Sequence, residues 1–472
     1  MEIRHFDLCV VGSGPAGQKC AIQAAKLGKT VCVVEQMEAV GGVAINTGTI
    51  PSKALREAVV AVLAARKHAD DVGGGTIDRT KELSLLIDYC QRVIRAEIEV
   101  VRRQLLDNGI ELMHGGASLL DANRIVVDGR HATETIDATH ILLAPGTAPA
   151  RPAHVPFDGE KIVTTDELLH LPYLPQTLIV VGGGVIGTEY ASMLSALGVR
   201  VTLIETRDRL LEFADREIVE ALQYQLRQSG MTLRLGEKVV EIKRVPAPAG
   251  SRTTGDLVQA TLASGKTLHA DCLLYSGGRQ GATDKLDLAT AGLTADERGR
   301  IKVNETFQTS VPHVYACGDV IGFPALASTS MEQGRLAACH MFGAPMVLEE
   351  EMLPYGIYAI PEISMVGATE DALTERAVPY ETGIAYYRET ARGQLLGDET
   401  GMLKLLIHQQ TEAILGVHII GTSATELVHI GQAVMRLKGT AEYFIETVFN
   451  YPTLAECYKV AAFNGRNKIR CS

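Results

Sequence analysis

One glycine motif occurs twice in this chain, and its repetition limits the possible folds more than any other feature. The pattern G-x-G-x-x-G begins at Gly12 and again at Gly182, an offset of 170 residues. Each copy follows a short apolar run, at residues 8–11 and 178–181. A strand, a glycine turn and a helix in this order are typical of a dinucleotide-binding unit. Because the arrangement recurs at a fixed spacing, the sequence predicts two dinucleotide sites.

Each position of the motif has a physical task. The first glycine allows a sharp turn, the second lets the backbone approach a pyrophosphate, and the third lets the helix pack closely on the strand. The helix N-terminus then directs free N–H groups and a partial positive charge at the phosphates. The residues expected to bind a dinucleotide are Gly12, Ser13, Gly14, Pro15 and Gly17 in the first copy, and Gly182, Gly184, Val185, Ile186 and Gly187 in the second.

An acidic residue completes each unit. Glu35 and Glu205 end the next apolar run, 18 residues beyond the last glycine of their motif. A carboxylate at this place can accept hydrogen bonds from an adenosine ribose. Proteins that hold two dinucleotides usually transfer hydride between them, so the repeat indicates an oxidoreductase.

The composition argues against several other classes of protein. The chain has 472 residues, of which 46% are apolar, and this length suits about three domains. A net charge of -11 argues against nucleic acid or an anionic membrane as the main partner, and no apolar stretch approaches the roughly 20 residues that span a bilayer. Nine scattered cysteines without a C-x-x-C pair favour reduced thiols. The first strand, expected by residue 6, leaves no room for a signal peptide, so we expect a cytoplasmic protein.

Apolar periodicity predicts the main elements. Strand, turn, helix and strand are expected over residues 6–35, and two long helices over residues 54–106, with a break at residues 70–75. The alternation over residues 110–143 is typical of short antiparallel strands, and residues 246–251 read as the tip of a hairpin. In the last part of the chain we expect strands at 402–407 and 414–420 and helices at 424–437 and 453–468. No spacing of histidines and cysteines predicts a metal site.

A longer segment adds a family resemblance. The residues from Gly41-Gly42 through Gly48-Thr49-Ile50-Pro51-Ser52-Lys53 resemble the active-site segment of the pyridine nucleotide-disulfide oxidoreductases. Residues 309–319 resemble the second FAD motif of that family, and Gly277-Gly278-Arg279 matches a further landmark. The resemblance covers essentially the whole chain, and it implies that the first glycine motif binds FAD and the second binds NAD or NADP.

The resemblance also implies the architecture. We expect an α/β fold with two Rossmann-like, doubly wound dinucleotide-binding domains and a C-terminal α+β dimerisation domain. FAD would be held by residues 1–150 and 275–345, NAD(P) by residues 151–274, and residues 346–472 would pair two subunits into a homodimer or larger homo-oligomer. By the same resemblance the further cofactor-binding residues are Glu35, Gly41, Gly42, Thr47, Lys53, Gly146, Gly278, Gly318 and Asp319.

The departures from the family pattern bear on the reaction. Disulfide reductases of this family carry Cys-x4-Cys in the active-site segment, where this chain has Ala44 and Thr49. Without a thiolate there is no exchange with a disulfide substrate. The family's C-terminal His-Pro-Thr-x-x-Glu element is also changed, because Tyr451 replaces the histidine while Glu456 is kept. A tyrosine with an ordinary pKa of about 10 is a poor base at neutral pH.

One branch of the family shows both departures. The segments Gly48–Lys53 and Asn450–Glu456 resemble those of the soluble pyridine nucleotide transhydrogenases. The resemblance implies an FAD-dependent, ping-pong transfer of hydride, in which NADPH reduces the flavin and NAD later takes the hydride at the same site. Two alternatives stay open: an NAD(P)H dehydrogenase that reduces quinones, dyes or oxygen, and a flavoprotein kept only for binding or assembly.

Four residues are candidates for roles in catalysis. By resemblance Lys53 lies near flavin N5 and pairs with Glu189, so its charge would stabilise the reduced flavin; the alternative is a purely structural ion pair. Tyr451 would lie at the neighbouring subunit's flavin, unless it only packs in the interface, and Glu456 is the fourth candidate.

Nucleotide preference rests on two charges of opposite sign. Glu205 suits the 2′-hydroxyl of NAD, whereas Arg207 and Arg209 could pair with the 2′-phosphate of NADP, unless they are simply solvated.

Overall fold

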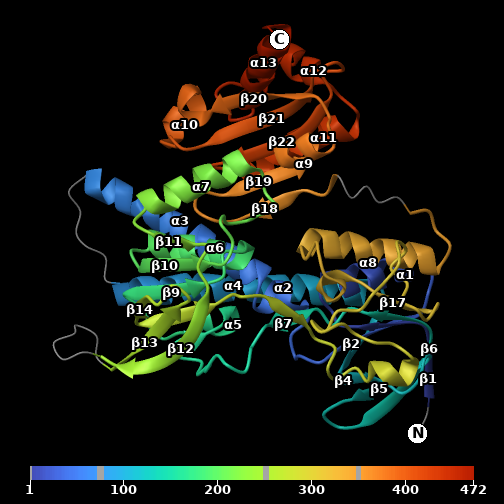
Figure 1. The fold of residues 1–472 in the computed structure, drawn as a ribbon. Helices are drawn as coiled ribbons and strands as arrows, with labels where there is room; N and C mark the ends of the chain where they lie inside the picture. Colours follow the sequence, from blue (N-terminus) through green and yellow to red (C-terminus); the bar gives the residue numbers. More distant parts are fainter. Residues whose placement is uncertain (1–2, 72–78, 248–254, 347–351, 472) are drawn as a thin grey trace. The chain divides into compact units, whose positions relative to one another are not determined.

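The computed structural model describes residues 3–71, 79–247, 255–346 and 352–471 (Figure 1). The chain divides into two compact units, each built from separate parts of the sequence. The first unit comprises Met1–Ala58, Gly75–Arg151 and Gly278–Leu348, and the second comprises Val59–Gly74, Pro152–Gly277 and Glu349–Ser472. The structure divides into two units, and the finer division into FAD, NAD(P) and interface domains stays a prediction.

The first unit is organised around a seven-stranded sheet. Its strand order is β3-β2-β1-β6-β5-β4, with β17 paired to β6. The strands are β1 (Ile3–Val11), β2 (Val31–Glu35), β3 (Glu111–His114), β4 (Gly116–Leu119), β5 (Arg124–Asp128), β6 (Thr133–Leu143) and β17 (Val314–Ala316). The central strands β1, β2 and β6 run parallel, and their buried positions are apolar except for Glu35 at the end of β2, as expected for a sheet covered on both faces. The strand, helix and strand predicted for residues 6–35 are confirmed.

Helices cover this sheet. The helices of this part are α1 (Pro15–Lys26), α2 (Gly42–Asn46), the first part of α3 (Thr49–Asp71), α4 (Arg79–Asp107) and α8 (Ala327–Met341). From Val59 onward α3 belongs to the second unit. Helices α1 and α8 lie side by side (Figure 1), and they approach closely because a Cβ on Gly334 would lie 2.0 Å from the carbonyl oxygen of Ala16. The two long helices predicted over residues 54–106 are confirmed, while most of the predicted break at 70–75 lies outside the described residues.

The prediction of antiparallel strands over residues 110–143 is only partly right. Strands β4, β5 and β6 pair antiparallel, but β3 pairs parallel with β2. The reason is that α3 and α4 lie between β2 and β3 in the chain. They bring the chain back to the end of the sheet at which β2 starts, so β3 runs in the same direction as β2.

The second unit contains a five-stranded parallel sheet with the order β11-β10-β9-β15-β8. Its elements are β8 (Ile162–Val163), α5 (Thr165–Leu168), β9 (Thr177–Val181), α6 (Val185–Ala196), β10 (Arg200–Glu205), α7 (Arg216–Gln228), β11 (Thr232–Leu235) and β15 (Cys272–Tyr275). A small antiparallel sheet follows, formed by β12 (Val239–Pro246), β13 (Asp256–Leu262) and β14 (Thr267–Ala270). Strands β12 and β13 form the predicted hairpin, but most of its tip lies outside the described residues.

The last part of the second unit is a five-stranded antiparallel sheet of order β18-β19-β22-β21-β20. Its elements are β18 (Tyr355–Ile357), β19 (Ile363–Gly367), α9 (Glu370–Glu375), β20 (Tyr380–Tyr386), α10 (Ala391–Leu396), β21 (Met402–His408), β22 (Ile414–Ile420), α11 (Ala424–Arg436), α12 (Ala441–Glu446) and α13 (Glu456–Cys471). Alternate residues of β21 and β22 join the core beneath α11 and α13. The strands and helices predicted for this part are confirmed, and the whole agrees with the expected α/β fold.

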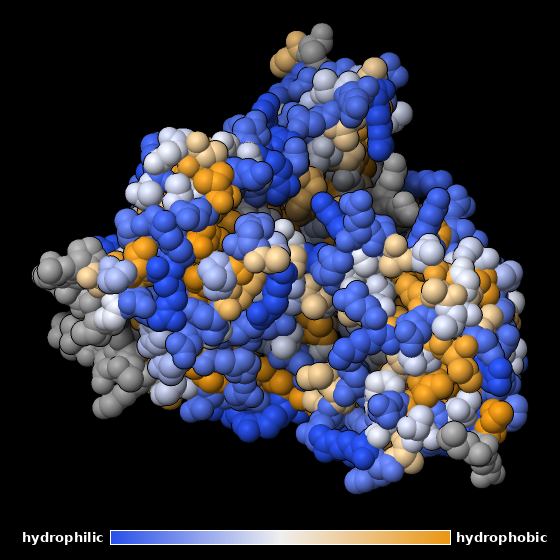
Figure 2. Space-filling model, turned by 60° about the horizontal axis from the view of Figure 1, so that its bottom comes forward, coloured by the Kyte–Doolittle hydropathy of each residue, from blue (hydrophilic) through white to orange (hydrophobic). Residues whose placement is uncertain are grey.

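On the face shown in Figure 2 hydrophilic residues predominate, and apolar residues form separate patches among them, which is normal for folded proteins. No helix within the described ranges combines the length and apolar character that crossing a bilayer demands.

Candidate functional site

The first glycine turn has the geometry that its sequence predicts. Gly12 has a φ of +100°, and a Cβ there would lie 2.2 Å from the carbonyl oxygen of Ala144. A Cβ on Gly17 would lie 1.9 Å from the carbonyl oxygen of Gly12, so only glycine lets α1 sit this close to the end of β1. At Gly14, by contrast, a Cβ would meet nothing nearer than 4.0 Å. That open space lies at the N-terminus of α1, where a phosphate would be bound.

A chain of hydrogen bonds joins three predicted residues beside this turn. Ser13 donates its backbone N–H and its hydroxyl to Glu35 Oε2, at 3.0 and 2.6 Å. The Ser13 hydroxyl in turn accepts a hydrogen bond from the backbone N–H of Gly41 at 2.9 Å. Glu35 also accepts from the N–H of Met37 at 2.9 Å. The acid at the end of β2 is thereby fixed against the glycine turn.

Two further predicted segments meet the start of α1. A Cβ on Gly42 would lie 2.9 Å from the Cα of Gly14, so these two backbones touch. Gly318, with a φ of +81°, would place a Cβ 3.2 Å from that of Ala16. Asp319 follows it, and its carboxylate is 3.4 Å from the hydroxyl of Thr147. The first turn, Gly42 and Asp319 therefore surround one helix N-terminus, which fits the pyrophosphate and ribityl chain of FAD.

Gly146 and Gly278 are brought together by a two-stranded ribbon. Strand β7 (Thr147–Pro149) pairs antiparallel with β16 (Arg279–Gly281), so the two glycines precede paired strands. The Arg279 guanidinium donates to the hydroxyl and the carbonyl oxygen of Thr147, both at 2.7 Å. Both glycines have positive φ and open space at the Cβ position. Their contact with a cofactor stays a prediction.

The active-site segment contains no sulfur. Ala44 lies within α2, Thr47 follows the end of that helix, and Thr49 begins α3. Lys53 stands one turn further along α3, with its Nζ 3.4 Å from the Ser52 hydroxyl. All nine cysteines are free and eight of them are buried, the exception being Cys471. The structure thus holds this family-like segment without a dithiol.

The second glycine turn repeats the first. Gly182 has a φ of +107°, and a Cβ on Gly187 would lie 1.9 Å from the carbonyl oxygen of Gly182. Gly184 precedes α6, whose first residues are Val185 and Ile186, and a Cβ on Gly184 would meet nothing within 4 Å. The repeat therefore extends from sequence to geometry, and a second phosphate site is available at the N-terminus of α6.

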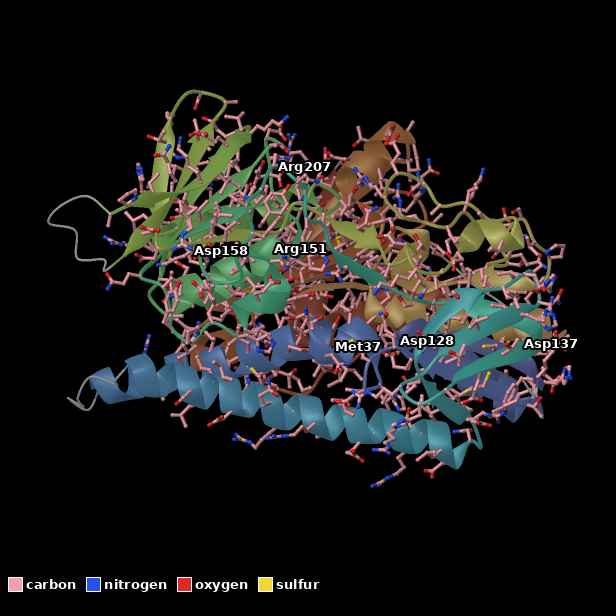
Figure 3. All side chains as sticks on the ribbon, turned by 90° about the horizontal axis from the view of Figure 1, so that it is seen from below. Met37, Asp128, Asp137, Arg151, Asp158 and Arg207 are labelled. Atoms are coloured by element: carbon pink, nitrogen blue, oxygen red, sulfur yellow. The ribbon has the colours of Figure 1, made fainter. Side chains whose placement is uncertain are left out.

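Glu205 is held by the turn and by Arg207. Its Oε2 accepts from the N–H of Gly183 at 2.6 Å, the contact that Ser13 makes to Glu35 in the first unit. Arg207, labelled in Figure 3, donates Nε to Oε1 at 3.0 Å and Nη2 to Oε2 at 3.1 Å. Burial raises the pKa of Glu205, but the hydrogen bonds from Arg207 and from the backbone outweigh it and lower this pKa to about 2. Glu205 is therefore ionised and already paired.

Glu189 and Lys53 lie in different units. Glu189 is buried in α6, and its Oε1 accepts a hydrogen bond from the backbone N–H of Tyr358 at 2.8 Å. Lys53 belongs to the first unit, so its pairing with Glu189 stays a prediction. The contact of Glu189 with Tyr358 joins the nucleotide-binding helix to the last part of the chain, and no motif in the sequence indicated it.

The two C-terminal candidates occupy different environments. Tyr451 is 73% exposed, as a residue that reaches a second subunit would be in a single chain. Glu456 is the first residue of α13, and its Oε2 is buried without a hydrogen-bond partner among the described residues. The location of Tyr451 at a neighbouring flavin and the catalytic role of Glu456 remain predictions.

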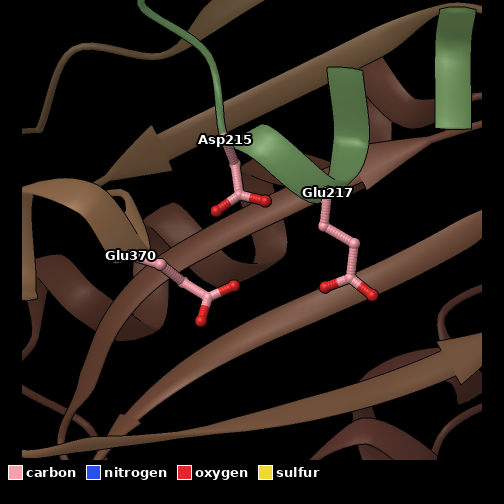
Figure 4. A group of neighbouring side chains, drawn as sticks. All are labelled: Asp215, Glu217 and Glu370. Atoms are coloured by element: carbon pink, nitrogen blue, oxygen red, sulfur yellow. The ribbon is translucent and has the colours of Figure 1, made fainter. Parts of the chain in front are cut away.

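One charged cluster was not predicted from the sequence. Asp215 and Glu217, at the start of α7, and Glu370, at the start of α9, direct their carboxylates toward one another (Figure 4). The fully buried ammonium of Lys404 lies among them, 2.9 Å from Asp215 Oδ1 and 2.9 Å from Glu217 Oε2, and it also contacts Glu370. His418, on the neighbouring strand, is fully buried, and its Nε2 lies 2.9 Å from the carbonyl oxygen of Ala368.

Known proteins resemble this chain along its whole length. The family model of pyridine nucleotide-disulphide oxidoreductases matches residues 6–334, and the model of their dimerisation domain matches residues 353–462. A protein of Mycobacterium tuberculosis (strain ATCC 25177 / H37Ra) named soluble pyridine nucleotide transhydrogenase is 51% identical over 99% of this chain and 98% of its own length. Proteins of the same name from Marinomonas sp. (strain MWYL1) and Yersinia pestis (strain Pestoides F) are each 44% identical, over 99% and 98% of this chain and 100% and 99% of their own lengths.

Solved structures show the same fold. LpdA from Mycobacterium tuberculosis superposes with a TM-score of 0.87 at 24% identity, covering 98% of this chain and 99% of its own. The flavoprotein disulfide reductase RclA from Escherichia coli gives a TM-score of 0.84 at 25% identity, covering 97% and 99%. On the matched domains, the fold and the relatives together, this chain belongs to the pyridine nucleotide-disulphide oxidoreductase family.

Proposed function

We propose that this protein transfers hydride from NADPH to NAD through a bound FAD, as a soluble pyridine nucleotide transhydrogenase. The observation that carries this function is the combination of two complete dinucleotide turns with Ala44 and Thr49 in place of a redox dithiol. The relatives of that name, up to 51% identical, support it. NADPH is oxidised to NADP and NAD is reduced, so electrons and hydride balance without a disulfide.

The first unit would hold the FAD. The N–H groups at the start of α1 face the open space at Gly14 and suit the pyrophosphate, while Asp319 suits the ribityl chain. The flavin, when bound, accepts hydride from one nicotinamide and gives it to another, which is chemistry that no side chain provides. The chain's own task is to orient the two rings and to keep water away from them.

The second unit would hold both nicotinamide nucleotides in turn. With FAD at the first glycine motif, the sequence offers a single further motif, at Gly182–Gly187, for both nicotinamide nucleotides. NADPH must therefore leave before NAD binds. Glu205 can accept hydrogen bonds from the ribose of NAD, and Arg207 can turn from Glu205 to the 2′-phosphate of NADP. The same pair of side chains thereby serves both substrates.

Lys53 is the residue we assign to tuning the flavin. An ammonium near the ring stabilises negative charge that develops there, and Glu189 would fix its position. A Lys53→Ala variant should keep its FAD but slow both half-reactions about tenfold or more. Stopped-flow measurement of flavin absorbance with NADPH, and separately with NAD, checks this; unchanged rates would remove the assigned role.

Two further properties belong to this function. The match of residues 353–462 to a dimerisation domain, together with the exposure of Tyr451, supports a homodimer in which Tyr451 and Glu456 approach the partner's flavin. Nine free cysteines support a cytoplasmic location, where thiols stay reduced.

The deciding experiment is anaerobic. The FAD-loaded enzyme is mixed with NADPH and an NAD analogue whose reduced form absorbs at a different wavelength. We expect one equivalent of reduced analogue for each NADPH consumed, in a ping-pong pattern of initial rates. If the analogue is not reduced while benzoquinone is reduced rapidly, the protein is instead an NAD(P)H dehydrogenase for quinones.

A further inference from the structure

The loop between β10 and α7 contains Arg207, and its backbone conformation is fixed by contacts with the glycine turn and with α7. Leu211 has a φ of +45°, which is a costly conformation for a residue with a Cβ and persists only where the surroundings impose it. The N–H of Leu211 lies 3.4 Å from the carbonyl oxygen of Gly183 in the glycine turn. The N–H of Leu210 donates to Gln223 Oε1 at 3.1 Å. Arg207 belongs to this loop, which comprises residues 206–215. The position of the loop therefore sets the position of the Arg207 side chain relative to a bound nucleotide.

The last part of the chain attaches to this loop at three places. Arg209 pairs with Asp371 at the start of α9, with its Nη1 3.3 Å from Oδ2. The ring of Phe213 lies beside that of Tyr355 in β18, with centroids 5.6 Å apart. Asp215, at the end of the loop, binds the ammonium of Lys404 at 2.9 Å. The partners of the loop thus come from three separate elements of the antiparallel sheet and its helix.

The ion pair of Lys404 with Asp215 is more buried than that of Arg209 with Asp371. Lys404 lies on the face of β21 opposite the core residues Leu403 and Leu405, since successive side chains of a strand point to opposite faces. Burial lowers the pKa of Lys404, but Asp215 and the neighbouring carboxylates outweigh it and raise this pKa above its ordinary value. The ammonium therefore stays charged, and removing it would leave the buried Asp215 carboxylate without its cation.

The same cluster uses two helix ends. Asp215 occupies the N-cap position of α7, Glu217 lies in the first turn of that helix, and Glu370 begins α9. Carboxylates are favourable at these positions because helix N-termini carry a partial positive charge. Lys404 thus ties the start of α7, where the loop ends, to the start of α9, where Asp371 holds Arg209.

We propose that Asp371 and Lys404 are positioning residues that set the preference between NADP and NAD, by fixing the loop on which Arg207 stands. The proposal rests on the proposed function, in which the second site accepts both nucleotides. Arg209 is engaged with Asp371, and it acts here as an anchor of the loop and not as a ligand of the 2′-phosphate. Loosening either anchor should weaken binding of a 2′-phosphate and leave the rest of the nucleotide bound as before.

The first test compares Asp371→Asn with Glu375→Gln. Glu375 lies on the same short helix and makes no hydrogen bond or ion pair among the described residues, so it is the matched control. Binding of 2′,5′-ADP and of 5′-AMP to the FAD-loaded enzyme is measured by calorimetry. Because an exposed ion pair is weak, we expect Asp371→Asn to bind 2′,5′-ADP about threefold less tightly. Its affinity for 5′-AMP and both affinities of Glu375→Gln should stay unchanged; an unchanged affinity of Asp371→Asn for 2′,5′-ADP would contradict an anchoring role.

A charge exchange separates anchoring from direct binding. Arg209→Asp should weaken 2′,5′-ADP binding, and the double variant with Asp371→Arg should restore it, because the ion pair is re-formed with its charges reversed. Should the double variant remain as weak as Arg209→Asp alone, Arg209 itself binds the phosphate and Asp371 has no positioning role.

The third variant removes the buried anchor. Lys404→Met should lower the affinity for 2′,5′-ADP about tenfold relative to 5′-AMP, with normal FAD content. If that variant does not fold, the Asp371 and Arg209 variants still decide the question, since their side chains are at the surface. Neither ligand can transfer hydride, so these measurements stay informative even if the anaerobic transhydrogenase experiment fails.

Discussion

Arg207 binds Glu205 through both carboxylate oxygens, with Nε 3.0 Å from Oε1 and Nη2 3.1 Å from Oε2. The acid that suits the ribose of NAD and the cation that suits the phosphate of NADP are therefore partners of each other. Glu205 is almost fully buried while Arg207 is 43% exposed, so the cation is the more mobile member of the pair. NAD must therefore compete with Arg207 for the carboxylate of Glu205, and NADP must compete with Glu205 for the guanidinium of Arg207.

Replacing Arg207 should shift the preference toward NAD. In Arg207→Gln the 2′-phosphate of NADPH loses a charge-assisted partner and meets an unscreened Glu205, so kcat/KM for NADPH should fall about 30-fold or more. The value for NADH should change about threefold at most, since Glu205 becomes free for the ribose. Both values are measured with a quinone acceptor, and an equal fall for both nucleotides would mean that Arg207 only supports the fold.

The pKa of Glu205 predicts a stability that depends on pH. Because its pKa is lowered to about 2 in the folded protein, against about 4.3 in an unfolded chain, its contribution is present above pH 4.3 and is lost as the pH falls toward 2. The contribution should be about 2 kcal/mol at pH 7 after allowance for the exposure of Arg207. The melting temperatures of wild type and Glu205→Gln should differ most at pH 7, the difference should fall to about half at pH 3, and it should nearly vanish at about pH 2. The exposed Glu220→Gln is the control, and a gap that does not narrow at low pH would contradict the lowered pKa.

Gly184→Ala tests the second phosphate site. A Cβ there meets nothing within 4 Å, so the variant should fold and retain FAD. The new methyl group occupies the space of the pyrophosphate, and KM should rise about tenfold for NADH and NADPH alike. Gly116→Ala, also in open space but on β4, is the matched control. An unchanged KM in Gly184→Ala would place the nucleotide elsewhere.

Alkylation tests the absence of thiol chemistry. Burial raises the pKa of Cys272 and of Cys457 to about 12, and the thiolate is the reactive form. Iodoacetamide at pH 8 should therefore modify only Cys471 in the native enzyme, without loss of hydride transfer. Mass spectrometry counts the labels, with the unfolded protein as the reference for nine. Inactivation that accompanies labelling of a buried cysteine would show that a thiol takes part.

Local sequence was sufficient to identify the two nucleotide-binding turns. Gly12 and Gly182 adopt a positive φ, and Gly17 and Gly187 lie against a carbonyl oxygen five residues earlier, so each has a reason for glycine that acts within a few residues. The alternation of apolar runs with the helix in between likewise depends only on neighbouring positions. For this reason the strands and helices around each turn agree with their predicted places.

The pairing of strands needed more than the local pattern. Residues 110–143 alternate like antiparallel strands, yet β3 is parallel to β2, because the direction of a strand depends on the crossover before it and not on its own side chains. The hydrogen bond from Tyr358 to Glu189 was not predictable either, since 169 residues separate the two partners.

The amino-acid sequence alone determined two dinucleotide turns, the acid that follows each of them and a segment without a dithiol, since each of these features depends on residues that are close together in the chain. Only the tertiary structure decided that Arg209 meets Asp371, 162 residues later, and that Lys404 meets Asp215, 189 residues earlier. A single Lys, Asp or Arg carries no local signal of its partner, because ion pairs are selected by the packing of distant elements. The tertiary structure therefore places the antiparallel sheet and α9 in contact with the loop of residues 206–215, and no sequence motif indicates these contacts.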